Sequence, residues 1–160
     1  MNEFESITQG ILTLLEEWEP KLLSLSAKII TSRRNLQNRT IKQIVGHMVD
    51  SASNNTHRIV HLQYQMSPCQ YPNYASHGNN DRWIAIQNYQ DEDWKNLVLL
   101  WKYSNWHIVH VINNVDTSKL ENQWQWDEDK FISLRDGIVD YLRHFKLHLN
   151  EIDELIKNSL

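Results

Sequence analysis

The chain has 160 residues, 41% of them hydrophobic, and a formal net charge of −4 at pH 7. This length predicts one domain, residues 1–160, with room for a substantial core. The charge gives no basic footprint for nucleic acid, and no apolar run approaches the roughly 18 residues that span a bilayer, so we expect neither a nucleic-acid partner nor a membrane partner. Cys69 is the single cysteine, which excludes an internal disulfide, and the acidic N-terminus lacks a signal-peptide core. The expected location is cytoplasmic.

The composition favours an all-α chain. Only 4 Gly and 3 Pro interrupt long stretches rich in Leu, Ile, Glu, Lys and Gln. A first helical segment is expected from residue 3 to about residue 30. Pro20 interrupts its pattern, either at a kink or in the first turn of a second helical piece.

The second helix is expected to run from Thr40 to about Tyr64. Thr40 and Gln43 have the spacing of a capping box, in which each side chain bonds the backbone N–H of the other residue. The following residues, 66–90, hold two prolines, Gly78 and several aromatic residues. Such a long stretch predicts a packed but irregular connection.

A third helix is expected to start near Asp91 and to end near Asn113 or Asn114. Residues 116–132 form a second irregular stretch, in which a short hairpin is possible. Ser133 has the features of an N-cap for the last helix, which should run to about Ile156. Four main helices joined by two long crossings predict a four-helix bundle.

His144 and His148 are the most informative residues of the chain. Their spacing of four places both on one face of the last helix, where two imidazoles can share a metal ion. At about 100° per residue they fall at the edge of the buried stripe. Gly137, two turns earlier on the same line, leaves room for a ligand or for a neighbouring backbone. A third ligand must come from another helix, and His47 is the candidate.

A polar line accompanies His47 on the second helix. Asp50, Asn54 and Arg58 lie within about 60° of it, away from the apolar stripe. This line is either a solvent-exposed face or the wall of a polar cavity, and the spacing alone leaves both interpretations open.

Other arrangements of the eight histidines compete with this trio. His57 and His61 form a second pair four residues apart, and His107 and His110 are three apart; either pair can be simple packing, and the latter could add a ligand. Glu-x-x-His motifs of a di-iron bundle are absent. A zinc protease would need Glu where Phe145 stands. The alternative for His144 and His148 is a half-buried pair that makes only local hydrogen bonds.

Three segments resemble the DinB/YfiT-like family of metal-dependent enzymes. Thr40–Arg58 is similar to the family's second-helix signature, Tyr141–His148 is similar to its closing His-x3-His helix, and the aromatic middle from Tyr74 to Trp94 also looks similar. The resemblance covers nearly the whole chain. It implies an all-α four-helix bundle of DinB/YfiT type with long aromatic-rich crossover loops, and a homodimer. It also implies one divalent ion, nickel or zinc, bound by His47, His144 and His148.

The sequence departs from the family pattern just before and within the second helix. Arg39 stands where many relatives have Trp, and Gln43 where they often have Glu. These positions concern the helix cap and nearby packing and leave the ligand set intact.

The function expected from this resemblance is that of a metal-dependent enzyme, a hydrolase or a thiol S-transferase, with an open coordination position. Its partner would be a small-molecule substrate, including low-molecular-weight thiols such as bacillithiol or mycothiol. Asp50 would orient a ligand or act as general base, and Asn54 and Arg58 would anchor a polar or anionic substrate. Two alternatives remain: a non-catalytic metal-binding or small-ligand-binding bundle, and a purely structural protein.

Overall fold

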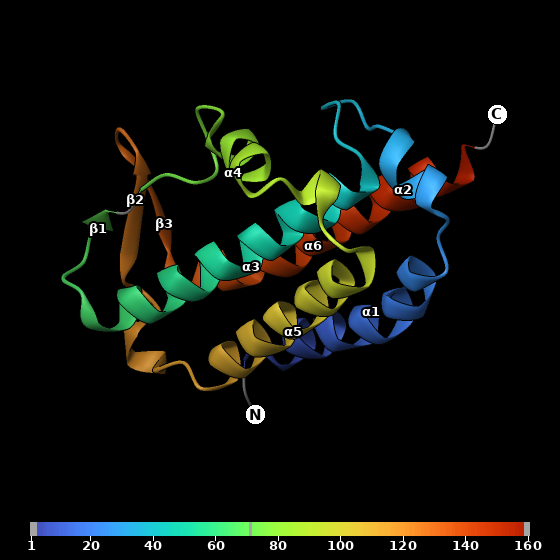
Figure 1. Cartoon of the computed structure of the whole chain (residues 1–160). Coiled ribbons are helices and arrows are strands. Elements are labelled where there is room, and N and C mark those ends of the chain that lie inside the picture. The colour runs from blue at the N-terminus through green and yellow to red at the C-terminus, as the bar shows by residue number, and fades with distance from the viewer. Residues whose placement is uncertain (1–2, 71, 159–160) are drawn as a thin grey trace.

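The computed structural model describes residues 3–70 and 72–158 (Figure 1). Its helices are α1 (Glu5–Leu23), α2 (Ala27–Ser32), α3 (Ile41–Tyr64), α4 (Asn79–Gln87), α5 (Trp94–Asn113) and α6 (Leu134–Lys157). Two short 3₁₀ segments, η1 (Tyr89–Asp91) and η2 (Thr117–Lys119), and three strands, β1 (Cys69–Gln70), β2 (Gln123–Asp127) and β3 (Lys130–Ser133), complete it. No helix in the described part of the chain is long and apolar enough to cross a membrane.

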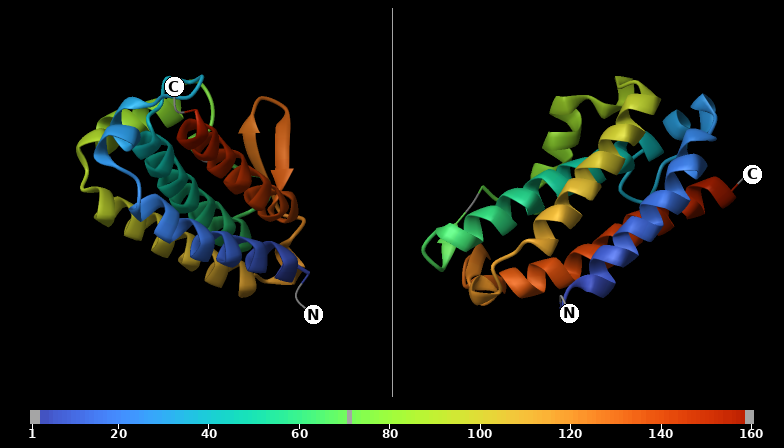
Figure 2. Two further views of the ribbon diagram at one scale, coloured as in Figure 1. Left: turned by 90° about the vertical axis from the view of Figure 1, so that its right-hand side faces the viewer. Right: turned by 90° about the horizontal axis from the view of Figure 1, so that it is seen from below.

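Helices α1, α3, α5 and α6 form a four-helix bundle. Both α1 and α3 pack against α5 and α6. Helices α3 and α5 run in the same direction, whereas α1 and α6 run in the opposite direction (Figures 1 and 2). Because two parallel neighbours cannot be joined by a short turn, the chain after α3 must return along the bundle before α5 begins. The predicted all-α bundle with long crossings is confirmed.

Local capping sets where the main helices begin. Thr40 Oγ1 accepts from Gln43 N–H at 3.3 Å, while Gln43 Oε1 accepts from Thr40 N–H at 2.9 Å. The predicted capping box is therefore present. Asp93 caps α5 and Ser133 caps α6 through equivalent side-chain bonds. These bonds satisfy N–H groups that have no partner inside the helix.

The apolar stripes of the four helices meet in one core. Trp101 of α5 is fully buried and stacks on Phe145 of α6, with ring centroids 5.8 Å apart. Tyr141 donates to Asn105 Oδ1 at 2.6 Å inside this core. Burial of the large rings stabilises the pairing of α5 with α6, and the hydrogen bond satisfies the hydroxyl of Tyr141 and the side-chain oxygen of Asn105.

Pro20 does not begin a second helical piece. It lies in the last turns of α1, which continues to Leu23, and the next helix starts only at Ala27 after Ser26 as N-cap. Of the two alternatives, the first-turn position is therefore wrong. Pro20 has no N–H to bond the carbonyl four residues earlier, so the last turns of α1 hold one backbone hydrogen bond fewer.

The stretch 66–90 is more regular than predicted. It contains α4, which begins after Gly78 and ends before Asn88, both in the left-handed region of φ. This helix has nine residues and Ile84 as its buried member, so it presents too short a pattern to be found by periodicity. The hairpin expected within 116–132 is present as β2 and β3, and β1 adds a parallel strand to β2.

Gly46 marks the closest approach between α3 and the crossover connection. A Cβ atom there would lie 2.2 Å from Cδ2 of Tyr89, a side chain that is 2% exposed and cannot move aside. Replacing glycine by alanine inside a helix normally stabilises the helix by about 1 kcal/mol. Because the added Cβ atom would clash with Tyr89, we expect Gly46→Ala instead to lower the free energy of unfolding by about 1–3 kcal/mol.

Urea denaturation measures this difference, and Gly137→Ala in α6 is the matched control. A Cβ atom at Gly137 would meet nothing within 4 Å, so this variant should be more stable than the parent by up to about 1 kcal/mol. Equal effects of the two substitutions would contradict the described packing of Tyr89.

Candidate metal centre

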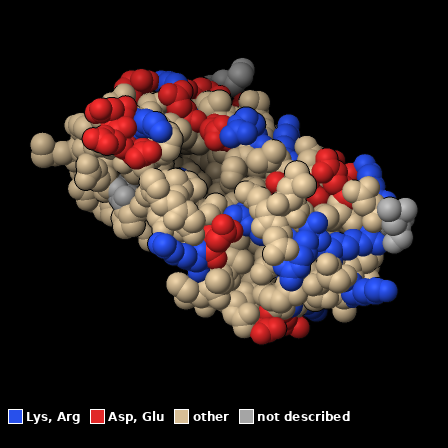
Figure 3. Space-filling view, turned by 90° about the horizontal axis from the view of Figure 1, so that it is seen from above, with Lys and Arg blue, Asp and Glu red and all other residues tan. Residues whose placement is uncertain are grey.

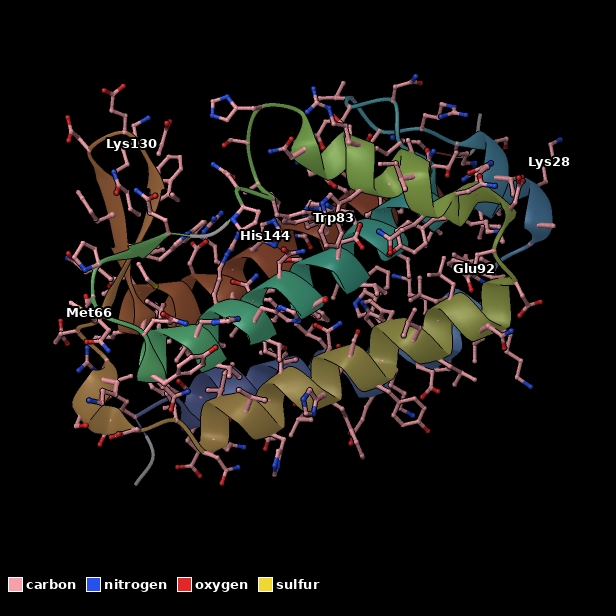
Figure 4. The ribbon with its side chains drawn as sticks, turned by 60° about the vertical axis from the view of Figure 1, so that its left-hand side comes forward. Lys28, Met66, Trp83, Glu92, Lys130 and His144 are labelled. Carbon is pink, nitrogen blue, oxygen red and sulfur yellow. The ribbon has the colours of Figure 1, made fainter. Side chains whose placement is uncertain are left out.

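Three histidines converge between α3 and α6. His47 comes from α3, and His144 and His148 from α6; one ligating nitrogen of each lies within 4.8 Å of the others. The Nε2 atoms of His144 and His148 are 3.0 Å apart. His47 and His148 are buried, and Figure 4 shows His144 in the interior of the molecule. The antiparallel pairing of the two helices thus brings together the trio that the sequence predicted.

Tyr74 fixes the orientation of His47. Its hydroxyl lies 2.7 Å from Nδ1 of His47 and donates to the backbone carbonyl of the same residue at 3.3 Å. A hydroxyl that donates to the carbonyl can at the same time accept from an Nδ1–H of His47 through its oxygen. This tautomer leaves the lone pair on Nε2, which is the arrangement of a metal-ligating imidazole.

The other two imidazoles also have a partner at Nδ1, a close one for His148 and a more distant one for His144. His148 Nδ1 lies 2.9 Å from Glu151 Oε2, and His144 Nδ1 lies 3.5 Å from Ser51 Oγ. Burial alone would raise the pKa of Glu151, but the hydrogen bond and charge of His148 outweigh it, and the pKa is lowered. The ionised carboxylate accepts from Nδ1–H and leaves Nε2 of His148 free to ligate. Outer partners of this kind orient metal ligands and are needed for high affinity.

The surroundings keep two of the imidazoles neutral. Burial, followed by repulsion from His148 and Arg39, lowers the pKa of His47 to about 2. Burial and the nearby His148 lower the pKa of His144 to about 4. Neutral imidazole is the form that binds a metal ion. Three imidazole donors, with no fourth donor grouped with them among the described residues, fit a divalent ion with an open position, which is the pattern of a catalytic site.

A cavity of about 390 Å³ opens against the three histidines. Helices α3 and α6, the crossover connection and the hairpin border it, and Figure 3 shows the surface hollowed beside the charged tip of the hairpin. Its volume lies in the range of pockets that bind small molecules. Aromatic and apolar side chains dominate the wall away from the histidines: Trp124, Trp126, Ile132, Leu134, Ile59 and Leu62.

Arg58 lines this cavity, as the sequence analysis anticipated for a substrate anchor. Its guanidinium lies over the ring of Trp124, 3.9 Å from the ring centroid. Asn54 lies elsewhere: its amide bonds the carbonyl of Asp50 in the preceding turn at 2.9 Å, and it is not among the lining residues. Of these two predicted anchors, the structure brings Arg58 alone to the cavity.

Asp50 lies outside the cavity, on the side of α3 that faces α4. Its Oδ1 accepts from Tyr89 at 2.6 Å and from Gln87 at 2.7 Å, and it lines a separate cleft between α3, α4 and α5 that also contains Trp83. Burial raises the pKa of this carboxyl. Asp50 therefore does not line the cavity beside His47. It lies three residues later, which places it about 60° around the helix from that histidine. In this position Asp50 orients Tyr89 and Gln87 instead.

The competing histidine pairs stay apart from the trio. The rings of His57 and His61 are 6.3 Å apart, and those of His107 and His110 are 6.4 Å apart. Among the described residues, neither pair belongs to a group of three donors close enough to hold an ion.

Sequence reasoning missed three residues that orient the histidines. Glu151 follows His148 by three positions, so helical spacing could have identified it, whereas Ser51 reaches His144 from another helix. Tyr74 carries no such signal, because it lies in the crossover connection and reaches His47 through the tertiary fold.

Comparison with known proteins relates this fold to solved structures, among them that of YfiT. No protein-family model and no curated protein matches the chain. YfiT from Bacillus subtilis, described as "a probable metal-dependent hydrolase with an unusual four-helix bundle topology", has a similar structure. The TM-score is 0.76 at 17% sequence identity, over 94% of this chain and 86% of that chain. The protein therefore has the DinB/YfiT-type fold that the sequence resemblance implied.

The lowered pKa values make a prediction about stability. A buried histidine that stays neutral in the folded state binds a proton only after unfolding, so unfolding becomes easier as the pH falls below the ordinary value of 6.5. Each such group contributes up to about 1.4 kcal/mol per pH unit. We expect the free energy of unfolding of the metal-free protein to fall as the pH is lowered from about 6.5 to about 4. Above pH 6.5 the two histidines should make no difference to how this free energy depends on pH.

Urea denaturation in the presence of a chelator measures this dependence. His47→Gln should make the slope against pH shallower, while His110→Gln on the exposed face of α5 should leave it unchanged. Constant stability of the parent protein across the window would show that the histidines are not held neutral.

Proposed function

We propose that this protein is a divalent-metal-dependent enzyme whose ion is held by His47, His144 and His148. One observation carries the proposal: the Nδ1 atom of each imidazole has its own partner, so the three Nε2 atoms are directed to one region at the wall of a small-molecule cavity. Zinc and nickel are the proposed ions, because neutral imidazole suits both.

A bound divalent ion supplies Lewis-acid chemistry at a coordination position that the three imidazoles leave open. The protein's own residues do the rest. Tyr74 and Glu151 keep the Nδ1 protons on their histidines and so keep the ligating nitrogens available. Trp124 and Trp126 exclude water from the far wall and offer apolar surface to a substrate.

Hydrolysis is the reaction class that we place first, by analogy with the description of YfiT. Transfer to a low-molecular-weight thiol is the second, because a thiolate is also a good ligand for zinc or nickel. The cavity argues against the third candidate, a non-catalytic metal-binding bundle, since a purely structural ion needs no space beside it. We carry forward the expectation of a homodimer from the family resemblance.

Elemental analysis tests the ligand set. The parent protein should carry one zinc or nickel ion per chain, and His144→Ala should abolish binding because two imidazoles and a serine remain. The double variant His107→Ala/His110→Ala is the control and should retain the ion. Unchanged metal content in His144→Ala would refute the proposed site. Screening the loaded protein against hydrolase substrates, and against thiols with electrophilic acceptors, then separates the reaction classes.

The role of Tyr74 can be tested separately. Tyr74→Phe keeps the ring but removes the oxygen that accepts from His47, and we expect metal affinity to fall by about tenfold to a hundredfold. Competition with a chromophoric chelator measures the dissociation constant. Tyr103→Phe, on the exposed face of α5, should bind the ion like the parent protein. Equal affinities of all three proteins would mean that Tyr74 does not orient the ligand.

A further inference from the structure

The guanidinium of Arg58 is a buried cation without an anionic partner. Its Nη2 atom is inaccessible to solvent and has no hydrogen-bond partner among the described residues. Its Nη1 atom reaches Asn55 Oδ1 at 3.4 Å, a long and weak contact. Burial lowers the pKa of Arg58 to about 10, which still leaves it charged at neutral pH. A charge held out of water in this way is unfavourable unless something pairs with it.

The position of Arg58 is fixed by its neighbours. The ring of Trp124 supports one face of the guanidinium at 3.9 Å, and Asn55, itself bonded to the Ser51 carbonyl at 2.8 Å, lies beside it. The second arginine of the cavity is different, because Arg39 bonds Asp81 Oδ1 through Nε and Nη2 at 3.1 and 2.7 Å. Among the described residues of the cavity wall, Arg58 is therefore the arginine that no carboxylate pairs with.

Arg58 and the three histidines lie at different places along one side of α3. His47, Ser51, Asn55 and Arg58 follow each other at steps of four, four and three residues, and all line the cavity. Eleven residues correspond to about 16 Å along the helix axis. Helical side chains lean toward the N-terminus of their helix, so the long side chain of Arg58 reaches back toward the histidine end of the cavity, as its contact with Asn55 shows.

We propose that the cavity takes an elongated organic anion, with its carboxylate at Arg58, its apolar body along Trp124 and Trp126, and its opposite end at the three histidines. This substrate class rests on the proposed function, because the histidine end needs the ion. A carboxylate offers two oxygens to the fork of donors on a guanidinium. The tryptophan rings give the connecting part of the ligand a surface to pack on.

Thiols with a terminal carboxylate test this proposal directly. The protein is loaded with Co²⁺, which replaces zinc in such sites and reports a bound thiolate by a charge-transfer band. The probes are mercaptoacetate, mercaptopropionate, mercaptohexanoate, mercaptooctanoate and mercaptoundecanoate, each with a terminal thiol, and the matching primary amides. For the probes long enough to span the cavity, we expect the carboxylate to bind about tenfold to a hundredfold more tightly than its amide.

Variants assign that preference to Arg58. Arg58→Gln should remove the carboxylate preference of the long probes, and Arg58→Lys should retain part of it, because the charge remains without the fork. Arg34→Gln removes one exposed charge elsewhere and should behave like the parent protein. Mercaptoethanol, which has no carboxylate, should bind the parent and both Arg58 variants equally, which shows that the metal centre is intact.

The outcomes separate the two proposals. Absence of the thiolate band in the cobalt-loaded parent protein would contradict the proposed metal-dependent function. A thiolate band with no preference for carboxylate over amide at any probe length would overturn the proposed substrate class alone, and this comparison uses only the parent protein. A preference that persists in a folded Arg58→Gln protein would assign the anion to another residue.

Discussion

The antiparallel packing of α3 against α6 is the constraint on which the candidate site depends. It sets His47 of one helix opposite His144 and His148 of the other. Neither helix alone brings three histidines together, so the site exists only while the bundle is assembled. Buried apolar residues on both helices fix this register, and His144 and His148 lie at the edge of the buried stripe of α6. The core and the metal centre are therefore stabilised by the same contact between two helices.

The shared direction of α3 and α5 has a second consequence for the site. It requires the chain to return along the bundle, and this returning segment passes over α3. Tyr74 lies in that segment and contacts Nδ1 of His47, while α4 covers the other side of the helix. The later hairpin, with Trp124, closes the remaining side of the cavity. The connections that topology requires thus become the walls of the site.

Local features of the sequence predicted much of this structure. The capping pairs of Thr40 and Ser133 and the periodicity of the long helices depend on residues a few positions apart, which a sequence shows directly. The histidine trio was identified with the help of the family resemblance. Helix α4 and Tyr74 were missed because their places depend on contacts between segments far apart in the chain. No periodicity encodes which segment will cover a given side of a helix.

The polar face of α3 illustrates this limit. The sequence placed Asp50, Asn54 and Arg58 on one line with His47, but the face is divided between two neighbours. Steps of four residues advance by about 40° around a helix and steps of three turn back by about 60°. Ser51 and Asn55 therefore turn toward α6 and the cavity, whereas Asp50 turns toward α4. The sequence left a solvent face and a cavity wall open as interpretations, and knowing where α6 packs decides between them.

The two ends of the cavity carry opposite charges. At the histidine end, the carboxylates of Asp140 and Glu151 lie close enough to influence the titration of His144. At the other end, the guanidinium of Arg58 has no carboxylate to pair with among the described residues. An anionic ligand bound with its charge at the histidine end would meet two carboxylates and leave Arg58 unpaired. The opposite orientation pairs the carboxylate with Arg58 and leaves the other end of the ligand to the proposed ion at the three imidazoles.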